Sequence, residues 1–368
     1  MKVIISGGGT GGHIYPALAI AEGLKKSYKN IDILYIGTED SLEAELVPKS
    51  GFEFKTIRVK SLPRKINMKL FISVKELLIG INDSKRIIKE FKPDLVIGTG
   101  GYVSGPIVYA AKKKNVPAII HEQNAYPGIT NKILSRYVDR VLVTFEDSKK
   151  YFKYPDKIVN TGNPIREEIF NADKNKAYKN LGIKKDKPIV LCFGGSGGQK
   201  SLNDSFYKII RENNIDFQLI HVTGKNHYEK FMKQLKDEGV SISKDTKILP
   251  YLHNMPEALN ITDLIVTSAG AISLSEISAV GIPAILIPKS YTAENHQEYN
   301  ARSFEKKGAA VVMLEKELKW DRLLSEISRL LKNREELNKM SNNSKKMGKY
   351  DSTRLIIKEI DKLTNKSN

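Results

Sequence analysis

The feature that most constrains the fold is an apolar run followed by a glycine loop and then a strong helix former. Residues 3–5 have the composition of a buried parallel strand, glycines cluster at residues 7–12, and residues 17–24 favour a helix. Glycine tolerates positive φ and lets the backbone pass close to a ligand. The unpaired N–H groups at the start of the helix favour an anionic group. The pattern therefore predicts a strand, a ligand-binding turn and a helix, in that order.

The same order recurs along the chain, which predicts βα units and parallel sheets. With 368 residues the chain is long for one core, and Asn163-Pro164 interrupts it near the middle. We expect an α/β fold with two Rossmann-like, doubly wound domains, residues 1–163 and 164–345, whose parallel sheets face each other across a cleft. Strands are expected at residues 31–37, 52–59, 94–101, 118–124, 138–144, 188–193, 217–223, 263–267 and 283–288.

Composition limits the classes of partner and the relation of the protein to a membrane. The formal net charge of +18 favours an anionic partner, which could be a nucleic acid, a phosphorylated substrate or a membrane surface. The single cysteine, Cys192, lies in an apolar run, so we expect a buried thiol and no internal disulfide. No apolar run reaches the roughly 18–20 residues of a membrane-spanning helix. We expect a protein without a leader peptide that is soluble or peripheral to a membrane.

His13 stands at the start of the first helix, directly after the glycine loop. A neutral imidazole there could accept a proton from a hydroxyl nucleophile, and the helix dipole would lower its pKa. The alternative is a structural histidine. The loop also matches G-x-G-x-x-G, but Asp32 begins the second strand rather than ending it. A sugar-nucleotide enzyme is therefore favoured over a nicotinamide-dependent oxidoreductase.

Polar side chains end several other predicted strands. The run from His121 to Asn124 suits sugar hydroxyls, although it could instead cap the next turn. Glu276, on a helix after a glycine turn, could accept hydrogen bonds from both ribose hydroxyls, and Gln297 suits a sugar. No Asp-x-Asp pair occurs in the sequence. We therefore expect no bound metal, with the diphosphate stabilised by backbone N–H groups and helix dipoles.

Residues 49–92 carry 12 Lys and Arg against 4 Asp and Glu. Leu70, Val74, Leu77, Leu78 and Ile81 form an apolar stripe at helical spacing within this segment. A basic rim around an apolar face suits an anionic bilayer. An ordinary helix packed on the sheet, with solvated lysines, explains the pattern equally well.

Several motifs, taken together and in order, resemble the MurG family of bacterial glycosyltransferases, which belong to glycosyltransferase family 28. The resemblance implies a GT-B fold and an inverting transfer without cofactor or nucleic-acid partner. In that reaction N-acetylglucosamine (GlcNAc) moves from UDP-GlcNAc to the C4 hydroxyl of MurNAc in undecaprenyl-diphosphate-MurNAc-pentapeptide (lipid I), which forms lipid II for peptidoglycan. The matching segments are residues 8–13, 100–106, 121–124, 162–166, 194–196, 200–203, 269–276 and Gln297.

The resemblance also implies roles for individual residues. His13 is the favoured base, with Glu122 and Tyr102 as second choices, and Asn124 and Gln297 hold sugar hydroxyls. The other implied contacts with UDP-GlcNAc are Thr10, Gly11 and Gly12 near the sugar and diphosphate, Arg166, Ser196 and Leu252 at the nucleotide, and Ala271, Ile272, Ser273, Leu274, Ser275 and Glu276 at the α-phosphate and ribose.

Membrane contact follows from the same resemblance. It implies that residues 49–92 contact the anionic inner leaflet, so that the protein is peripheral on the cytoplasmic side of the cell membrane. The first domain would take the acceptor, the second would take the donor, and a helix at about 346–368 would return to the first domain. Two departures stand out: Ser268 replaces a frequent Arg, and residues 197–199 read Gly-Gly-Gln. Another GT-B glycolipid glycosyltransferase or a nucleotide-sugar binding protein remains as an alternative.

Overall fold

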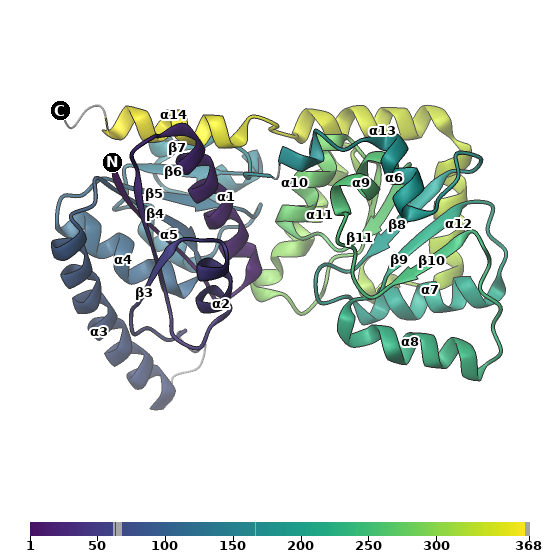
Figure 1. The fold of residues 1–368 in the computed structure, drawn as a ribbon, viewed down its shortest axis with the longest axis horizontal. Coiled ribbons are helices and arrows are strands. Elements are labelled where there is room, and N and C mark those ends of the chain that lie inside the picture. The colour runs from purple at the N-terminus through teal and green to yellow at the C-terminus, as the bar shows by residue number, and fades with distance from the viewer. Residues whose placement is uncertain (62, 64–67, 166, 365–368) are drawn as a thin grey trace. The chain divides into compact units, whose positions relative to one another are not determined.

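The computed structural model describes residues 1–61, 63, 68–165 and 167–364. The chain forms two compact units (Figure 1). Unit 1 comprises Met1–Ile165 together with Tyr350–Asn368, and unit 2 comprises Arg166–Lys349. Each unit is a parallel sheet with helices on both faces, as expected of a Rossmann-like domain.

Unit 1 contains a seven-stranded parallel sheet in the order β3-β2-β1-β4-β5-β6-β7. Its inner strands are almost wholly buried, which explains their continuous apolar runs. The strands are β1 (Lys2–Gly7), β2 (Asp32–Gly37), β3 (Glu53–Thr56), β4 (Leu95–Gly100), β5 (Ala118–Glu122), β6 (Arg140–Val143) and β7 (Ile158–Asn160). The helices are α1 (Gly11–Ser27), α2 (Leu42–Lys49), α3 (Met68–Phe91), α4 (Gly101–Lys113), α5 (Ile129–Leu134) and α14 (Ser352–Thr364).

The last helix, α14, packs against α1 within unit 1. Ile356 and Ile360 are buried in the same apolar cluster as Leu24 of α1. The Ser352 hydroxyl donates a 2.8 Å hydrogen bond to the carbonyl oxygen of Asn163, and Arg140 pairs with Glu359 at 3.4 Å. The chain thus closes the first unit with its C-terminal helix.

Unit 2 contains a six-stranded parallel sheet in the order β10-β9-β8-β11-β12-β13. The strands are β8 (Ile189–Phe193), β9 (Gln218–Val222), β10 (Thr246–Leu249), β11 (Leu264–Thr267), β12 (Ala284–Leu286) and β13 (Ala310–Val312). The helices are α6 (Lys174–Leu181), α7 (Lys200–Glu212), α8 (Lys225–Asp237), α9 (Met255–Ile261), α10 (Ala271–Val280), α11 (His296–Lys306), α12 (Trp320–Lys332) and α13 (Arg334–Met347).

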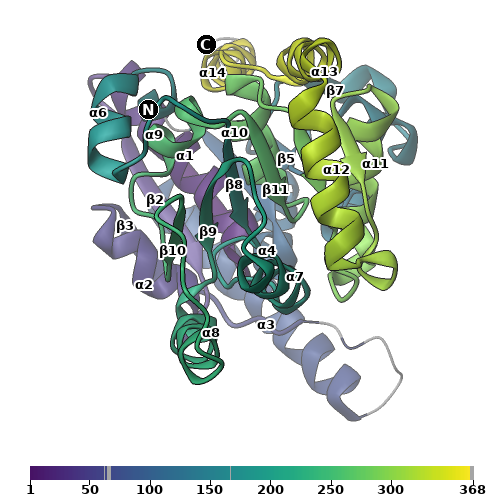
Figure 2. The ribbon, with the colours of Figure 1, turned by 90° about the vertical axis from the view of Figure 1, so that its right-hand side faces the viewer.

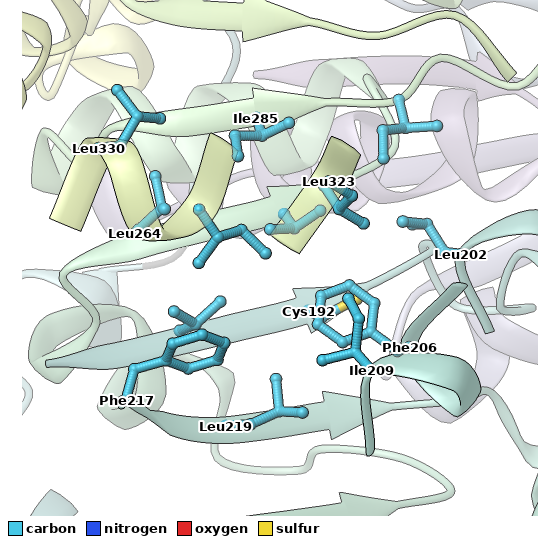
Figure 3. Close-up of a cluster of buried hydrophobic side chains, with 14 of the residues drawn as sticks. Cys192, Leu202, Phe206, Ile209, Phe217, Leu219, Leu264, Ile285, Leu323 and Leu330 are labelled. Atoms are coloured by element: carbon cyan, nitrogen blue, oxygen red, sulfur yellow. The ribbon is translucent and has the colours of Figure 1, made fainter. Parts of the chain in front are cut away.

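Cys192 lies in the main core of unit 2, on the central strand β8. Figure 3 shows its sulfur beside Phe206 among side chains from the sheet and from the covering helices. The thiol is buried and unpaired, and burial raises its pKa well above the ordinary value. The prediction of an inert core cysteine is consistent with this environment.

Three edge strands were not predicted from the sequence: β7, β10 and β13. Each borders its sheet on one side only, and most of its side chains are half-buried. Edge strands of this kind are short and lack the continuous apolar run that marks a central strand. These segments are identified as strands only by their pairing with β6, β9 and β12 in the structure.

Helix α3 has an unusual distribution of side chains. Figures 1 and 2 both show its N-terminal end extending away from the rest of unit 1. Of the predicted stripe, Leu77 packs against the core, whereas Val74 and Leu78 are exposed. None of the helices in the described part of the chain has the length and apolar character needed to cross a bilayer.

Candidate active site

The first glycine loop joins β1 to α1, and three neighbouring side chains hold its shape. The Tyr35 hydroxyl donates a 2.6 Å hydrogen bond to the carbonyl oxygen of Gly7. The buried Glu43 carboxylate accepts one from the Gly9 N–H at 3.2 Å. The Thr99 hydroxyl donates to the carbonyl oxygen of His13 at 2.8 Å. The sequence analysis missed these three residues, because each stands on a different element from the loop.

His13 lies in the first turn of α1, and its ring is oriented by the loop. Its Nδ1 lies 3.1 Å from the carbonyl oxygen of Gly8. Because a carbonyl oxygen only accepts, Nδ1 must carry the proton, and the neutral ring then presents Nε2 as an acceptor. Burial lowers the pKa of His13, opposed by the Gly8 hydrogen bond and the Glu43 charge. The direction agrees with the sequence analysis, and burial is its largest cause.

The second glycine pair, Gly100-Gly101, makes room for the His13 ring. Both residues have positive φ, +109° and +76°. A Cβ built on Gly100 would lie 2.9 Å from Cδ2 of His13, and one on Gly101 would lie 2.2 Å from the Gly8 carbonyl oxygen. Any larger residue would displace the ring or the loop. The two glycine motifs, far apart in the sequence, therefore build one site.

Glu122, the last residue of β5, is buried and organises the loop that follows. Its carboxylate accepts hydrogen bonds from Asn124 N at 2.9 Å, Gly128 N at 3.1 Å and Asn131 Nδ2 at 2.8 Å. Burial raises the pKa of Glu122, and these hydrogen bonds oppose the shift. Asn131 Nδ2 also lies 3.5 Å from the point where a Gly100 Cβ would be. Asn131 therefore links Glu122 to the His13 site.

The other members of the His121–Asn124 run divide between interior and surface. His121 and Gln123 are fully buried, and Gln123 Nε2 lies 2.9 Å from His121 Nδ1. His121 Nε2 lies 2.9 Å from the carbonyl oxygen of Gly162 and so ties β5 to the end of unit 1. Of the four residues, Asn124 alone remains half-exposed, as does Tyr102 beside the first loop.

In unit 2 the predicted donor residues gather at the carboxyl edge of the sheet. Ser196 is exposed in the loop after β8, and Leu252 is buried in the segment after β10. Helix α10 begins at Ala271 directly after Gly270, at the end of β11, and carries Glu276. Arg166 lies outside the described residues. The helix positions the remaining predicted contacts Ile272, Ser273, Leu274 and Ser275.

Gln297 is oriented by the backbone of the chain before it. Its side-chain oxygen accepts a 3.0 Å hydrogen bond from the backbone N–H of Lys289. Because the side-chain oxygen of Gln297 faces Lys289, its side-chain NH2 group points away from Lys289 and is free to donate hydrogen bonds elsewhere. A donor in this position can bind a sugar hydroxyl or a phosphate oxygen.

Glu315 connects the loop after β8 to the segment after β12. Its carboxylate accepts hydrogen bonds from Gln199 Nε2 at 2.8 Å, the Ser201 hydroxyl at 2.6 Å and the Ser290 backbone N–H at 2.8 Å. Burial raises the pKa of Glu315, but these hydrogen bonds outweigh it and lower the pKa to about 2. Gln199, noted in the sequence as a departure, thus has a structural partner.

We expect Glu315→Gln to lower the free energy of unfolding at pH 7 by about 1 kcal/mol. This is less than the full free-energy equivalent of the pKa shift, because solvent screens the partly exposed carboxylate. The folded pKa lies below the ordinary 4.5, so this stabilisation is complete above pH 4.5 and is lost as the pH falls towards about 2. Urea unfolding at pH 7 and pH 3 should show the difference narrowing in acid. The exposed Glu317→Gln is the control, and a constant difference would contradict the assignment.

Among the described residues, no group of three or more His, Cys, Asp or Glu side chains is placed to hold a metal ion. The groups of unit 2 that can bind an anionic ligand include backbone N–H groups, amides, hydroxyls and the Lys289 ammonium group. In unit 1 they are an oriented imidazole and a glycine loop. Each of these sets contains groups of the kinds used in transfer from a nucleotide-linked sugar to a hydroxyl group.

Comparison with known families agrees with this chemistry. The family described as the glycosyltransferase family 28 N-terminal domain matches residues 3–143, and its C-terminal domain matches residues 189–356. The chain belongs to glycosyltransferase family 28.

Individual relatives are similar over nearly the whole chain. The UDP-N-acetylglucosamine--N-acetylmuramyl-(pentapeptide) pyrophosphoryl-undecaprenol N-acetylglucosamine transferase of Clostridioides difficile is 50% identical, over 99% of this chain and 90% of the relative. The transferase of the same name from Finegoldia magna is 50% identical over 99% and 98%. The crystal structure of Acinetobacter baumannii MurG has a TM-score of 0.79 at 27% identity, covering 98% of this chain and 99% of that one.

Proposed function

We propose that the protein transfers GlcNAc from UDP-GlcNAc to the C4 hydroxyl of MurNAc in lipid I and so forms lipid II for peptidoglycan synthesis. The observation that carries this proposal is the 50% identity to the Clostridioides difficile transferase over 99% of the chain. The oriented His13 imidazole in unit 1 supplies the base that such a transfer requires.

The chemistry uses one group transfer and one proton transfer. The C4 oxygen of the acceptor forms a bond to C1 of GlcNAc, and the bond from C1 to the β-phosphate oxygen breaks, so that UDP leaves. Attack from the opposite face inverts C1 and gives a β-1,4 linkage. His13 Nε2 takes the proton of the hydroxyl group, because Nδ1 is already committed to Gly8.

The remaining residues divide by unit. Thr10, Gly11 and Gly12 shape the loop near the transferred sugar, and Asn124 binds its hydroxyls together with Gln297. Unit 2 binds the nucleotide, with α10 directed at the α-phosphate and Glu276 at the ribose. Arg166, Ser196 and Leu252 complete the proposed donor contacts. Glu122 acts as a positioning residue, because its oxygens already accept hydrogen bonds from Asn124, Gly128 and Asn131.

Release of UDP, measured with and without a lipid I analogue, tests the proposal. A lipid I transferase releases UDP from UDP-GlcNAc only when the analogue is present and forms the disaccharide. A nucleotide-sugar binding protein would be stabilised by UDP-GlcNAc but release no UDP. Turnover with a different glycolipid but not with the lipid I analogue would assign the chain to another acceptor.

We further propose that α3 contacts the cytoplasmic face of the cell membrane. Its N-terminal half exposes the α3 apolar face: Met68, Phe71, Ile72, Val74 and Leu78, which are 42–74% exposed. The residues that α3 buries are small or polar up to Ser84 (Ser73, Gly80, Asp83 and Ser84), and the buried apolar side chains of Ile87 and Ile88 lie near its C-terminal end. A half-helix that exposes large apolar side chains is suited to a bilayer surface. Lys69 and Lys75 are exposed on the same half, whereas Lys65 lies outside the described residues.

Neutralising Lys69 and Lys75 together should weaken retention on vesicles rich in anionic lipid. At about 1 kcal/mol per lysine, the partition constant should fall by roughly thirtyfold. Phe71→Ser with Leu78→Ser should weaken retention on neutral vesicles as well. The control is Lys208→Gln with Lys230→Gln, which makes the same charge change on exposed positions of unit 2. Equal losses in the control pair would mean that net charge, not α3, causes retention.

A further inference from the structure

Three neighbouring strand ends of unit 2 bring a cation to the glycine loop. β8, β11 and β12 are adjacent in the sheet, and Gly195, Ser268 and Lys289 follow their carboxyl ends. Gly195 has φ +79° and no side chain. The space where its Cβ would stand lies 3.6 Å from the Ser268 hydroxyl oxygen and 4.0 Å from Lys289 Nζ. A hydroxyl group and an ammonium group thus both lie within 4.0 Å of the point where a side chain at Gly195 would begin.

The structure itself holds Lys289 in this position. Its Nζ donates a 2.8 Å hydrogen bond to the carbonyl oxygen of Gly198, at the far end of the same loop. Its backbone N–H binds the Gln297 side chain, and its ammonium group lies 5.9 Å from the centre of the Tyr291 ring. One hydrogen bond to a carbonyl leaves two of the three N–H donors to other acceptors.

The nearest carboxylate in this network has other partners. Glu315 accepts hydrogen bonds from Gln199, Ser201 and Ser290, and among the described residues it interacts with Lys289 through its charge rather than through a direct salt bridge. Lys289 is half-buried; burial lowers its pKa, and the nearby charge of Glu315 opposes that shift. Because this ammonium group forms no direct salt bridge with Glu315, it keeps N–H donors for a ligand anion.

We infer that Lys289 is a binding residue for the diphosphate of the nucleotide donor, with the Ser268 hydroxyl beside it above Gly195. This inference rests on the proposed function for the identity of the ligand. Backbone N–H groups and helix ends contribute partial charges, whereas an ammonium group contributes a full one. As the bond to C1 breaks, negative charge accumulates on the departing diphosphate, and a fixed cation stabilises it. The sequence analysis expected backbone N–H groups and helix dipoles to stabilise the diphosphate, and this inference adds a side-chain cation to them.

The competing explanation is that Lys289 only holds the loop through Gly198. A series of ligands that share the nucleoside but differ in phosphates separates the two roles. Calorimetric affinities of uridine, UMP and UDP would be measured for the full-length protein, Lys289→Met and Lys289→Arg. Lys289→Met keeps the length of the side chain and removes its charge, while Lys289→Arg keeps the charge.

Lys289→Met should weaken UDP binding by roughly ten- to a hundredfold, as expected for loss of a charge-assisted hydrogen bond, and leave uridine binding unchanged. Lys289→Arg should recover much of the loss, and the exposed control Lys208→Met should bind all three ligands normally. Equal weakening of uridine and UDP would assign a loop-holding role, and unchanged UDP binding would exclude the contact. Because no acceptor is present, these results stand apart from the transfer assay: a protein that binds UDP through Lys289 but transfers nothing would contradict only the proposed function.

Discussion

His13→Ala should lower kcat by about 10²- to 10⁴-fold, the usual contribution of a general base. The ring is the only part of His13 that the substitution removes, and the Thr99 hydroxyl bonds to its backbone carbonyl, which remains. UDP affinity should therefore stay within about twofold of the wild type, because unit 2 carries the proposed nucleotide contacts. The measurement is steady-state transfer to a lipid I analogue, with thermal unfolding as the check on the fold.

The pH profile separates His13 from the other candidate bases. The base must be deprotonated, so activity is complete above its pKa and falls as the pH drops through it. Burial lowers the pKa of His13 below the ordinary 6.5, so the acid limb of kcat/KM should lie below pH 6.5 in the wild type. His13→Ala should lose this limb together with its rate.

Two variants serve as matched controls. Tyr102→Phe removes only a hydroxyl group and should cost less than about tenfold in kcat if this group is not the base. Glu122→Gln should chiefly lower the unfolding temperature, since the carboxylate accepts hydrogen bonds that organise the loop from Asn124 to Asn131. If His13→Ala keeps most of its rate and its acid limb while Tyr102→Phe or Glu122→Gln loses both, the base is misassigned.

The second large effect is a loss of stability in mild acid that originates in His221. This residue is fully buried on β9, where its ring stacks on Phe206 with 5.1 Å between ring centres and lies tilted against Phe231 at 5.2 Å. Neither ring nitrogen has a hydrogen-bond partner among the described residues. Burial lowers the pKa of His221 to about 3. Between pH 6.5 and about 3, the imidazole is therefore neutral in the folded unit and protonated in the unfolded chain.

The sign of the effect follows from this difference. Between pH 6.5 and about 3 the unfolded chain binds a proton that the folded unit does not, so stability is complete above pH 6.5 and declines below it. At pH 5 the loss from His221 alone is about 2 kcal/mol. His121 in unit 1, whose pKa burial lowers to about 4, should produce a similar decline there.

His221→Leu should reduce the loss of stability in acid in unit 2 and leave that of unit 1 unchanged. Leucine has a similar volume and no nitrogen to desolvate, so the variant should be at least as stable as the wild type at pH 7 and about 2 kcal/mol less sensitive to acid at pH 5. Hydrogen exchange of strand amides measures the stability of each unit separately. Unit 1 amides and the exposed control His253→Gln should behave as the wild type. An unchanged acid response of unit 2 amides would contradict this account.

Local patterns were sufficient for the central strands and for the two glycine loops. β1, β4, β5, β8 and β11 contain apolar runs that lead into small or polar residues, and such runs indicate buried parallel strands without further information. The loops are equally local, because positive φ and close approach require glycine at the position itself. His13 could be singled out because it directly follows such a loop.

The partners of those loops could not be found in the same way. Glu43 is 34 residues from Gly9, and Gln199 is 116 residues from Glu315, yet each pair shares a hydrogen bond. Lys289 looks like any solvated lysine in the sequence, and only the adjacency of β8, β11 and β12 brings it to Gly195. In the sequence, His121 and Gln123 resemble ligand-binding residues, whereas the structure buries both side chains.

The sequence by itself determined the order of strands and helices, the positions of the glycine turns, and the family to which the chain belongs. These depend on residue type at each position or a few positions apart. The tertiary structure alone decided which carboxylates hold the loops, which nitrogen of His13 is the acceptor, and where a lysine meets the donor loop. Hydrogen bonding and burial in those cases depend on side chains from separate strands, and the linear pattern carries no record of their adjacency.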